Sequence, residues 1–231
     1  MHDATVGPAL DHVVLAARSR ADIDAQLAAM GLEAGSSRSI PGAGLSNVVV
    51  AVGTQLLELH HPDDTPIAAA APPYARIQQE ALRAHPDVAL VPVAWLVRFE
   101  TEPQLREASA RAGYPVVAVP AEPPNDAPHL LGGLGAAFDR PWLRAFIHWS
   151  RPPHLPPTLV ADHDRGPNDG HLGLDVSGPA DEIATWCGTL PPDVTVEAGD
   201  AGPLRVRIHR ADADPAIIGI PPADSGRTEP S

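Results

Sequence analysis

The chain has 231 residues, which is enough for one large domain or two small ones with a substantial core. Sixteen Lys and Arg residues against 29 Asp and Glu residues give a net charge of −13, and no concentrated basic face suits nucleic acid or an anionic membrane. One cysteine excludes a disulfide within the chain, and no apolar stretch approaches the roughly 20 residues of a membrane span. We therefore expect a cytoplasmic protein.

The first unit of the chain begins with an extended strand over Leu10–Ala17, whose inward-facing polar residue is His12. A helix is predicted over Arg20–Leu32 because apolar residues recur there at helical spacing, with Gly31 at the end. Three extended segments follow, the last two as a hairpin: one near Arg38, Leu45–Val52 and Gln55–His61. The order is strand, helix and then three strands.

The same order recurs twice after Pro-rich linkers. A connecting helix is predicted over Tyr74–His85, and the second unit follows it. The predicted elements of the second unit are a strand at Val91–Glu100, a helix from Thr101 to Gly113, a strand at Tyr114–Val119, a loop at Glu122–Gly133, and strands at Leu134–Asp139 and Trp142–Ser150. Those of the third unit are a strand at His171–Val176, a helix at Pro179–Thr189, and strands at Val194–Ala198, Leu204–His209 and Ala216–Ile220.

This internal repeat sets the expected domain organisation. The predicted segments are a first module at 1–66, a linker helix at 67–90, a second module at 91–151, a Pro-rich linker at 152–170, a third module at 171–221 and a flexible tail at 222–231. One such unit exposes an apolar sheet face that it cannot bury alone, and pairing two units into a cupped surface solves this. The third unit then packs on the pair or on a second copy of the chain, so a homodimer is possible.

Four short motifs carry a family resemblance. They are LDHVVLAAR at 10–18, PGAGLSN at 41–47, QLLELHHPDD at 55–64 and FIHW at 146–149. In this order they resemble the vicinal oxygen chelate superfamily, which includes glyoxalase I, extradiol dioxygenases and bleomycin-resistance proteins, and most closely its glyoxalase-like domain branch. The resemblance implies an α+β fold of tandem βαβββ modules with cupped mixed sheets, here with three module-like repeats.

The resemblance also implies a metal site. In the superfamily, ligands come from the first and last strands of two paired modules, which points to His12, Glu58 and His148, with Ala94 at the fourth position. Two histidines and a carboxylate suit one divalent metal, Zn, Fe, Mn or Ni. Because Ala94 offers no ligand, a metal-free cavity is the alternative.

The alternation of strand residues predicts which side chains share this cavity. Glu58 shares a face with His60, and His148 shares a face with Phe146. The catalytic candidates are Glu58 and His148, either of which could move a proton. The substrate-binding candidates are Arg98, His60, Phe146 and Asn47. Arg98 suits a carboxylate or phosphate, although a salt bridge to a glutamate at the strand end explains it equally well.

Two functions follow from these residues. The first is an enzyme of lyase, isomerase or dioxygenase type that acts on a small oxygenated metabolite between the paired sheets. The second is a metal-free protein that binds and sequesters a small molecule such as an antibiotic. Metal content and the fate of the ligand separate the two.

Overall fold

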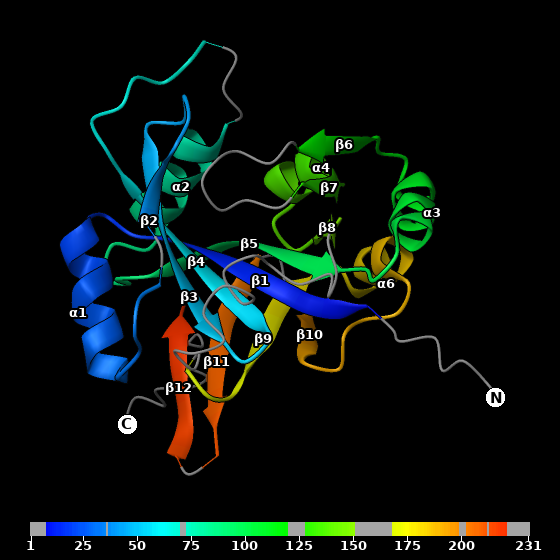
Figure 1. Cartoon of the computed structure of the whole chain (residues 1–231). Helices are drawn as coiled ribbons and strands as arrows, with labels where there is room; N and C mark the ends of the chain where they lie inside the picture. Colours follow the sequence, from blue (N-terminus) through cyan, green and yellow to red (C-terminus); the bar gives the residue numbers. More distant parts are fainter. Residues whose placement is uncertain are drawn as a thin grey trace, which may run out of the picture.

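The computed structural model describes residues 8–35, 37–69, 73–119, 128–150, 168–198, 202–211 and 213–220, which form three successive βαβββ units (Figure 1). The first unit contains β1 (Ala9–Ala16), α1 (Arg20–Met30), β2 (Ser37–Ile40), β3 (Leu45–Val52) and β4 (Gln55–Pro62). After α2 (Tyr74–Ala84), the second unit contains β5 (Val91–Arg98), α3 (Glu102–Ala112), β6 (Val116–Val119), β7 (His129–Gly132), α4 (Leu134–Asp139) and β8 (Ala145–Trp149). The third contains β9 (His171–Gly178), α6 (Ala180–Cys187), β10 (Val194–Ala198), β11 (Pro203–Arg210) and β12 (Ala213–Gly219).

The first two units share one mixed sheet of eight strands in the order β2-β3-β4-β1-β5-β8-β7-β6. In each unit the first strand runs parallel to the last, β1 beside β4 and β5 beside β8. The antiparallel pair β1–β5 joins the two halves at the centre of the sheet (Figure 1). The predicted α+β fold of paired βαβββ modules with a curled mixed sheet is therefore confirmed.

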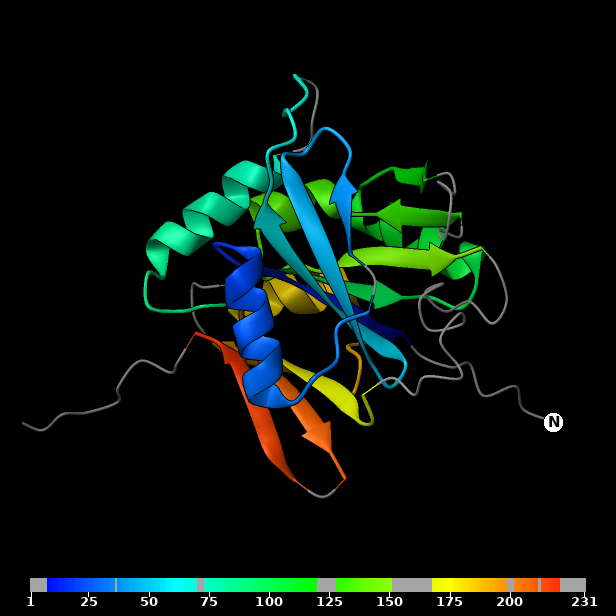
Figure 2. The same ribbon diagram turned by 60° about the vertical axis from the view of Figure 1, so that its left-hand side comes forward.

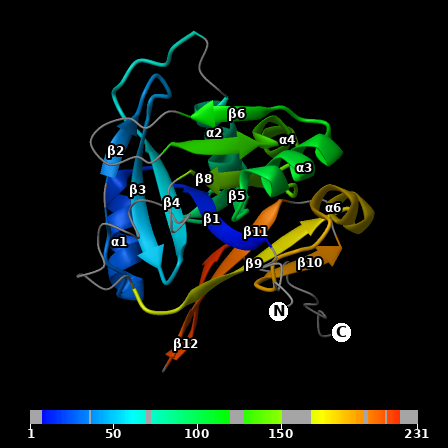
Figure 3. The same ribbon diagram turned by 45° about the vertical axis from the view of Figure 1, so that its right-hand side comes forward.

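The third unit packs against the other two within the same chain. Figures 2 and 3 show its strands on the side of the large sheet away from α2, and β11 and β12 contact β5. The core between the sheets includes Leu15, Trp95 and Val97 from one side and Leu174 and Ile208 from the other. All five side chains are fully or almost fully buried, each worth about 1.5–3 kcal/mol of apolar burial.

Strand order distinguishes the third unit from the other two. Its four-stranded sheet runs β10-β9-β11-β12, so β10, the strand after the helix, pairs with the first strand β9, whereas β2 and β6 pair with the strand that follows each of them. The third unit thus has the predicted order of elements, but its strands pair differently from those of the first two units.

Two element predictions in the second unit are wrong. Residues Leu134–Asp139 form helix α4 instead of a strand, and His129–Gly132, within the predicted loop, forms strand β7. A short apolar run such as that in α4 cannot be assigned to helix or strand by periodicity alone. The segment His129–Gly132 forms a strand because it pairs with β8 on one side and with β6 on the other.

Some predicted segments lie partly or wholly outside the described residues. These are the start of the chain at 1–7, the linker at 152–170 apart from 168–170, and the tail at 222–231. Within the described part of the chain, no helix is long and apolar enough to cross a membrane.

Gly170 lies directly before β9, where the chain passes very close to the backbone of the neighbouring strand β11. Its φ is +131°, and an added Cβ would lie 1.9 Å from the His209 carbonyl oxygen. We expect Gly170→Ala to lower the free energy of unfolding by about 3 kcal/mol, because both strain and a backbone clash result. Gly113→Ala is the control, since Gly113 has φ +75° and open space around it, so only about 1 kcal/mol is expected there. If urea unfolding showed the same loss of unfolding free energy for both variants, the close packing at Gly170 would be contradicted.

Candidate functional site

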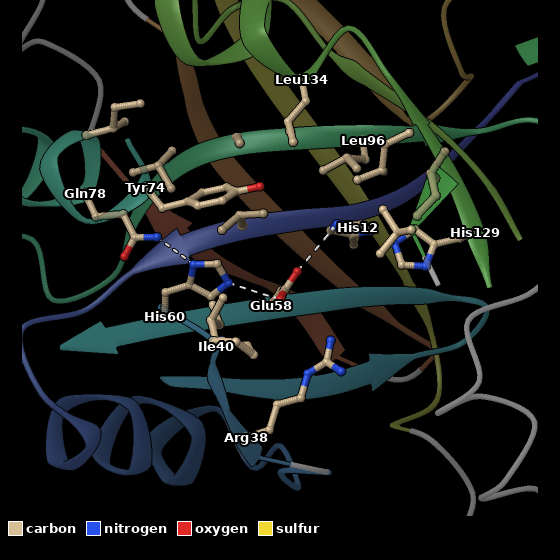
Figure 4. Close-up of a pocket in the computed structure, with 18 of the residues that line it drawn as sticks. His12, Arg38, Ile40, Glu58, His60, Tyr74, Gln78, Leu96, His129 and Leu134 are labelled. Atoms are coloured by element: carbon tan, nitrogen blue, oxygen red, sulfur yellow. Dashed lines mark hydrogen bonds and ion pairs between the residues drawn. The ribbon is translucent and has the colours of Figure 1, made fainter. Parts of the chain in front are cut away.

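A cavity of about 450 Å³ lies between the eight-stranded sheet and α2 (Figure 4). Strands β1 and β4 provide its polar floor through His12, Glu58 and His60. Helix α2 contributes Tyr74 and Gln78. The remaining lining residues are Val14, Arg38, Ser39, Ile40, Pro41, Ile77, Val93, Ala94, Leu96, Val119, His129, Leu131, Leu134, Ile147 and Trp149.

Glu58 is the centre of the polar floor. It lies on β4, where residues two apart share a face, so His60 points to the same side. The Asn47 amide on β3 donates a 2.7 Å hydrogen bond to Glu58 Oε1. His60 Nε2 lies 3.1 Å from the same oxygen, and His12 Nε2 lies 3.6 Å from Glu58 Oε2. The carboxylate is therefore held between two imidazoles and an amide (Figure 4).

These neighbours decide the charge of Glu58. Burial alone would raise its pKa, but the His60 charge and hydrogen bond, the His12 charge and the Asn47 hydrogen bond together hold that pKa well below its usual range. Glu58 is consequently ionised at neutral pH, inside a cavity that is otherwise largely apolar.

His12 is held between two carboxylates. Its Nδ1 lies 2.9 Å from Asp11 Oδ2, and its Nε2 faces Glu58. Burial lowers the pKa of His12, but the Asp11 hydrogen bond and the charges of Asp11 and Glu58 outweigh it and raise the pKa above 6.5. The two carboxylates therefore favour the protonated form of His12 relative to an isolated imidazole.

Asp11 reaches His12 because β1 contains a bulge. The β1–β5 pairing shifts between Leu10 and His12, which leaves Asp11 as the extra residue on β1. Its side chain is fully buried, and it accepts a 3.0 Å hydrogen bond from Arg98 Nη1 and a 3.3 Å one from Trp149 Nε1. The buried Asp11 carboxylate thus pairs with the Arg98 guanidinium and holds the rings of His12 and Trp149 in place.

Helix α2 completes the polar floor from the other side. The Gln78 amide nitrogen lies 2.6 Å from His60 Nδ1, and both side chains are buried. Burial and the nearby Glu58 charge raise the pKa of Tyr74 to about 12, so its hydroxyl stays protonated. A continuous row of polar side chains therefore crosses the floor from Gln78 through His60, Glu58 and His12 to Asp11.

The structure brings together some of the residues predicted from sequence and not others. His12, Glu58 and His60 meet in the cavity, and Asn47 supports Glu58 from β3. His148 and Phe146 are buried but do not belong to the cavity lining, because β8 presents Ile147 and Trp149 to it instead. His148 Nδ1 lies 3.0 Å from the Phe99 carbonyl oxygen, and Phe146 packs with Phe99 and Leu105.

Arg98 also lies outside the cavity lining. Its guanidinium donates to Asp11 and, over 3.2 Å, to the Thr54 carbonyl oxygen. The sequence interpretation of the cavity did not include Asp11, Arg38, Tyr74 or Gln78, nor His129 and Trp149. The alternation of strand residues places Asp11 on the opposite face from His12, and only the bulge in β1 brings its side chain to His12. Nothing in the sequence assigns α2, which carries Tyr74 and Gln78, to the cavity.

The residues present do not fit the metal centre that the sequence resemblance implied. Within the described ranges, no group of three or more His, Cys, Asp and Glu side chains has an arrangement that could hold a metal ion. Of the lining residues from the second unit, Ala94, Leu96 and Ile147 cannot ligate, and His129 is the histidine that this unit contributes. The chemistry below therefore uses the side chains of this chain alone.

Comparison with known proteins agrees with the fold. A family model described as glyoxalase-like domain matches residues 10–186, and the chain belongs to this family, within the vicinal oxygen chelate superfamily. No curated protein matches the chain.

Three solved structures are similar at low sequence identity. A hypothetical protein from Staphylococcus aureus has 9% identity and a TM-score of 0.51, covering 94% of this chain and 87% of its own. Methylmalonyl-CoA epimerase from Mycobacterium tuberculosis has 13% identity and a TM-score of 0.42, with coverage of 64% and 89%. Hypothetical protein BH1468 from Bacillus halodurans C-125 has 14% identity and a TM-score of 0.41, with coverage of 62% and 93%. The first of these supports the fold over nearly the whole chain.

The shifted pKa values of the floor residues make stability depend on pH. The Glu58 contribution is fully present above about pH 4.5 and is lost as pH falls toward its lowered pKa. The His12 contribution is fully present below about pH 6.5 and is lost as pH rises through its raised pKa. Together they should be greatest between these values, as urea unfolding at pH 4, 5.5 and 8 would measure. His12→Gln should flatten the decline above pH 6.5, and parallel profiles for the two proteins would contradict the raised pKa.

Proposed function

We propose that the protein is an enzyme of isomerase or lyase type that moves a proton on a small oxygenated metabolite in this cavity. The observation that carries the proposal is the ionised Glu58 held between His12 and His60 on the floor of a largely apolar cavity. Perturbed ionisable groups that converge in a cavity are typical of acid–base sites.

The two central residues have complementary roles. His12, whose Nε2 faces Glu58 at the cavity floor, hydrogen-bonds a substrate carbonyl oxygen and stabilises the negative charge that develops there. Glu58 accepts the proton from the adjacent carbon and returns it to the same or a neighbouring carbon, so that charge and atoms balance. A carboxylate with a low pKa is a weak base, and its basicity rises when the His12 N–H hydrogen-bonds the substrate oxygen in place of Glu58, while His60 and Asn47 stay bound to the carboxylate.

Exchange of carbon-bound protons in D₂O tests the proposal without knowledge of the natural substrate. The purified protein is incubated with small 2-oxo acids and hydroxyketones, and loss of the proton signal beside the carbonyl is followed by NMR. We expect at least one class to exchange about a hundredfold faster than in buffer alone. If no compound that binds is exchanged, the proposed proton transfer is wrong.

A metal-free binding protein is the second candidate. The apolar lining of the second-unit wall favours it, since apolar surface contributes binding energy without any chemistry. In that case the same compounds raise the melting temperature by mass action and are recovered unchanged.

A further inference from the structure

The two halves of the cavity differ sharply in polarity. The second-unit half is apolar apart from His129 and the Trp149 ring; its apolar members are Val93, Ala94, Leu96, Val119, Leu131, Leu134 and Ile147. The first-unit half holds the ionisable floor and Arg38. A ligand that matches both halves has a polar end and an apolar body.

Charge decides which polar end fits. On the floor, the Glu58 carboxylate lies beside His12, and behind it the Asp11 carboxylate is paired with Arg98. Among the lining residues that the structure describes, Arg38 is the one Lys or Arg side chain.

Arg38 is placed at the open edge of the cavity. It lies on the edge strand β2, it is exposed, and its side chain points from β2 toward the Glu58 side of the cavity (Figure 4). A guanidinium in this position can bind a carboxylate through two parallel hydrogen bonds.

We infer that the ligand is a small carboxylic acid with an apolar body and a second oxygen beside the carboxylate. The carboxylate binds Arg38, the second oxygen accepts a hydrogen bond from His12, and the apolar body packs on the second-unit wall. This assignment rests on the proposed function, because it uses the same floor. A volume of about 450 Å³ lies toward the small end of ligand cavities and suits a metabolite of this size.

A matched pair of probes tests the role of Arg38. Titration calorimetry compares 2-oxohexanoate with 2-hexanone, which has the same carbonyl and a similar apolar chain but no carboxylate. We expect the wild-type protein to bind the acid about tenfold more tightly, and Arg38→Gln to abolish that preference while 2-hexanone binding stays unchanged. Arg76→Gln is the control, since Arg76 is an exposed residue of α2 that pairs with Glu80 and does not line the cavity.

The readout separates this inference from the proposed catalysis. A preference for the acid that Arg38→Gln removes, in a protein that exchanges no proton, supports the ligand assignment and overturns the catalysis. Proton exchange with equal affinity for acid and ketone overturns the ligand assignment and leaves the catalysis standing. Failure of both compounds to bind at millimolar concentration also overturns the ligand assignment.

Discussion

Asp11→Asn should lower the free energy of unfolding by about 3 kcal/mol. Asp11 is completely buried and pairs with Arg98, whose side chain is itself mostly buried. Removing one member of a buried ion pair leaves the other charge without compensation, which costs far more than the pair contributes. Denaturant unfolding measures the loss directly.

An exposed ion pair provides the control for this experiment. Asp24 pairs with Arg20 one helical turn away, with both side chains about half exposed, so Asp24→Asn should cost no more than about 0.5 kcal/mol. The Asp11 variant should also show a lower His12 pKa by NMR titration, because His12 loses its charged partner. A loss as small as that of the control, with an unchanged His12 pKa, would contradict the buried network.

Glu58→Gln should reduce proton exchange by about a hundredfold or more, because the amide cannot accept the carbon proton. Glutamine retains the size of the side chain and can still accept a hydrogen bond from Asn47. Ligand affinity should therefore change much less than the exchange rate, which is the pattern expected when a group acts in the transition state.

Glu100→Gln is the matched control for Glu58. Glu100 is an exposed glutamate after the end of β5, so its replacement should leave both exchange and binding unaltered. Exchange by the Glu58 variant at the wild-type rate would assign the proton transfer to another group.

Strand alternation explains which parts of the site were predictable. The motif at the start of β1 identified His12, and period two on β4 placed Glu58 and His60 on one face, as the structure has them. On β8 the assignment of His148 depended on its position in the last strand of the second module, and an error of one residue there exchanges the two faces of a strand. The cavity consequently receives Ile147 and Trp149 from β8.

Long-range packing explains what the sequence left open. The bulge at Asp11 depends on the pairing of β1 with β5, which lies some eighty residues further along the chain. Likewise, the repeat predicted a third unit, but whether it packs in the chain depends on the apolar face that β1 and β5 present to it. Neither feature is visible in local periodicity.

A crystal structure of the protein with 2-oxohexanoate tests the central claim most directly. We expect the ligand between the floor strands β1 and β4 and the apolar wall of the second unit, with its 2-oxygen near His12 Nε2 and its C3 facing Glu58. The carboxylate should lie on Arg38. Binding elsewhere on the molecule, or a reversed ligand with its apolar chain against Glu58, would contradict the proposed site.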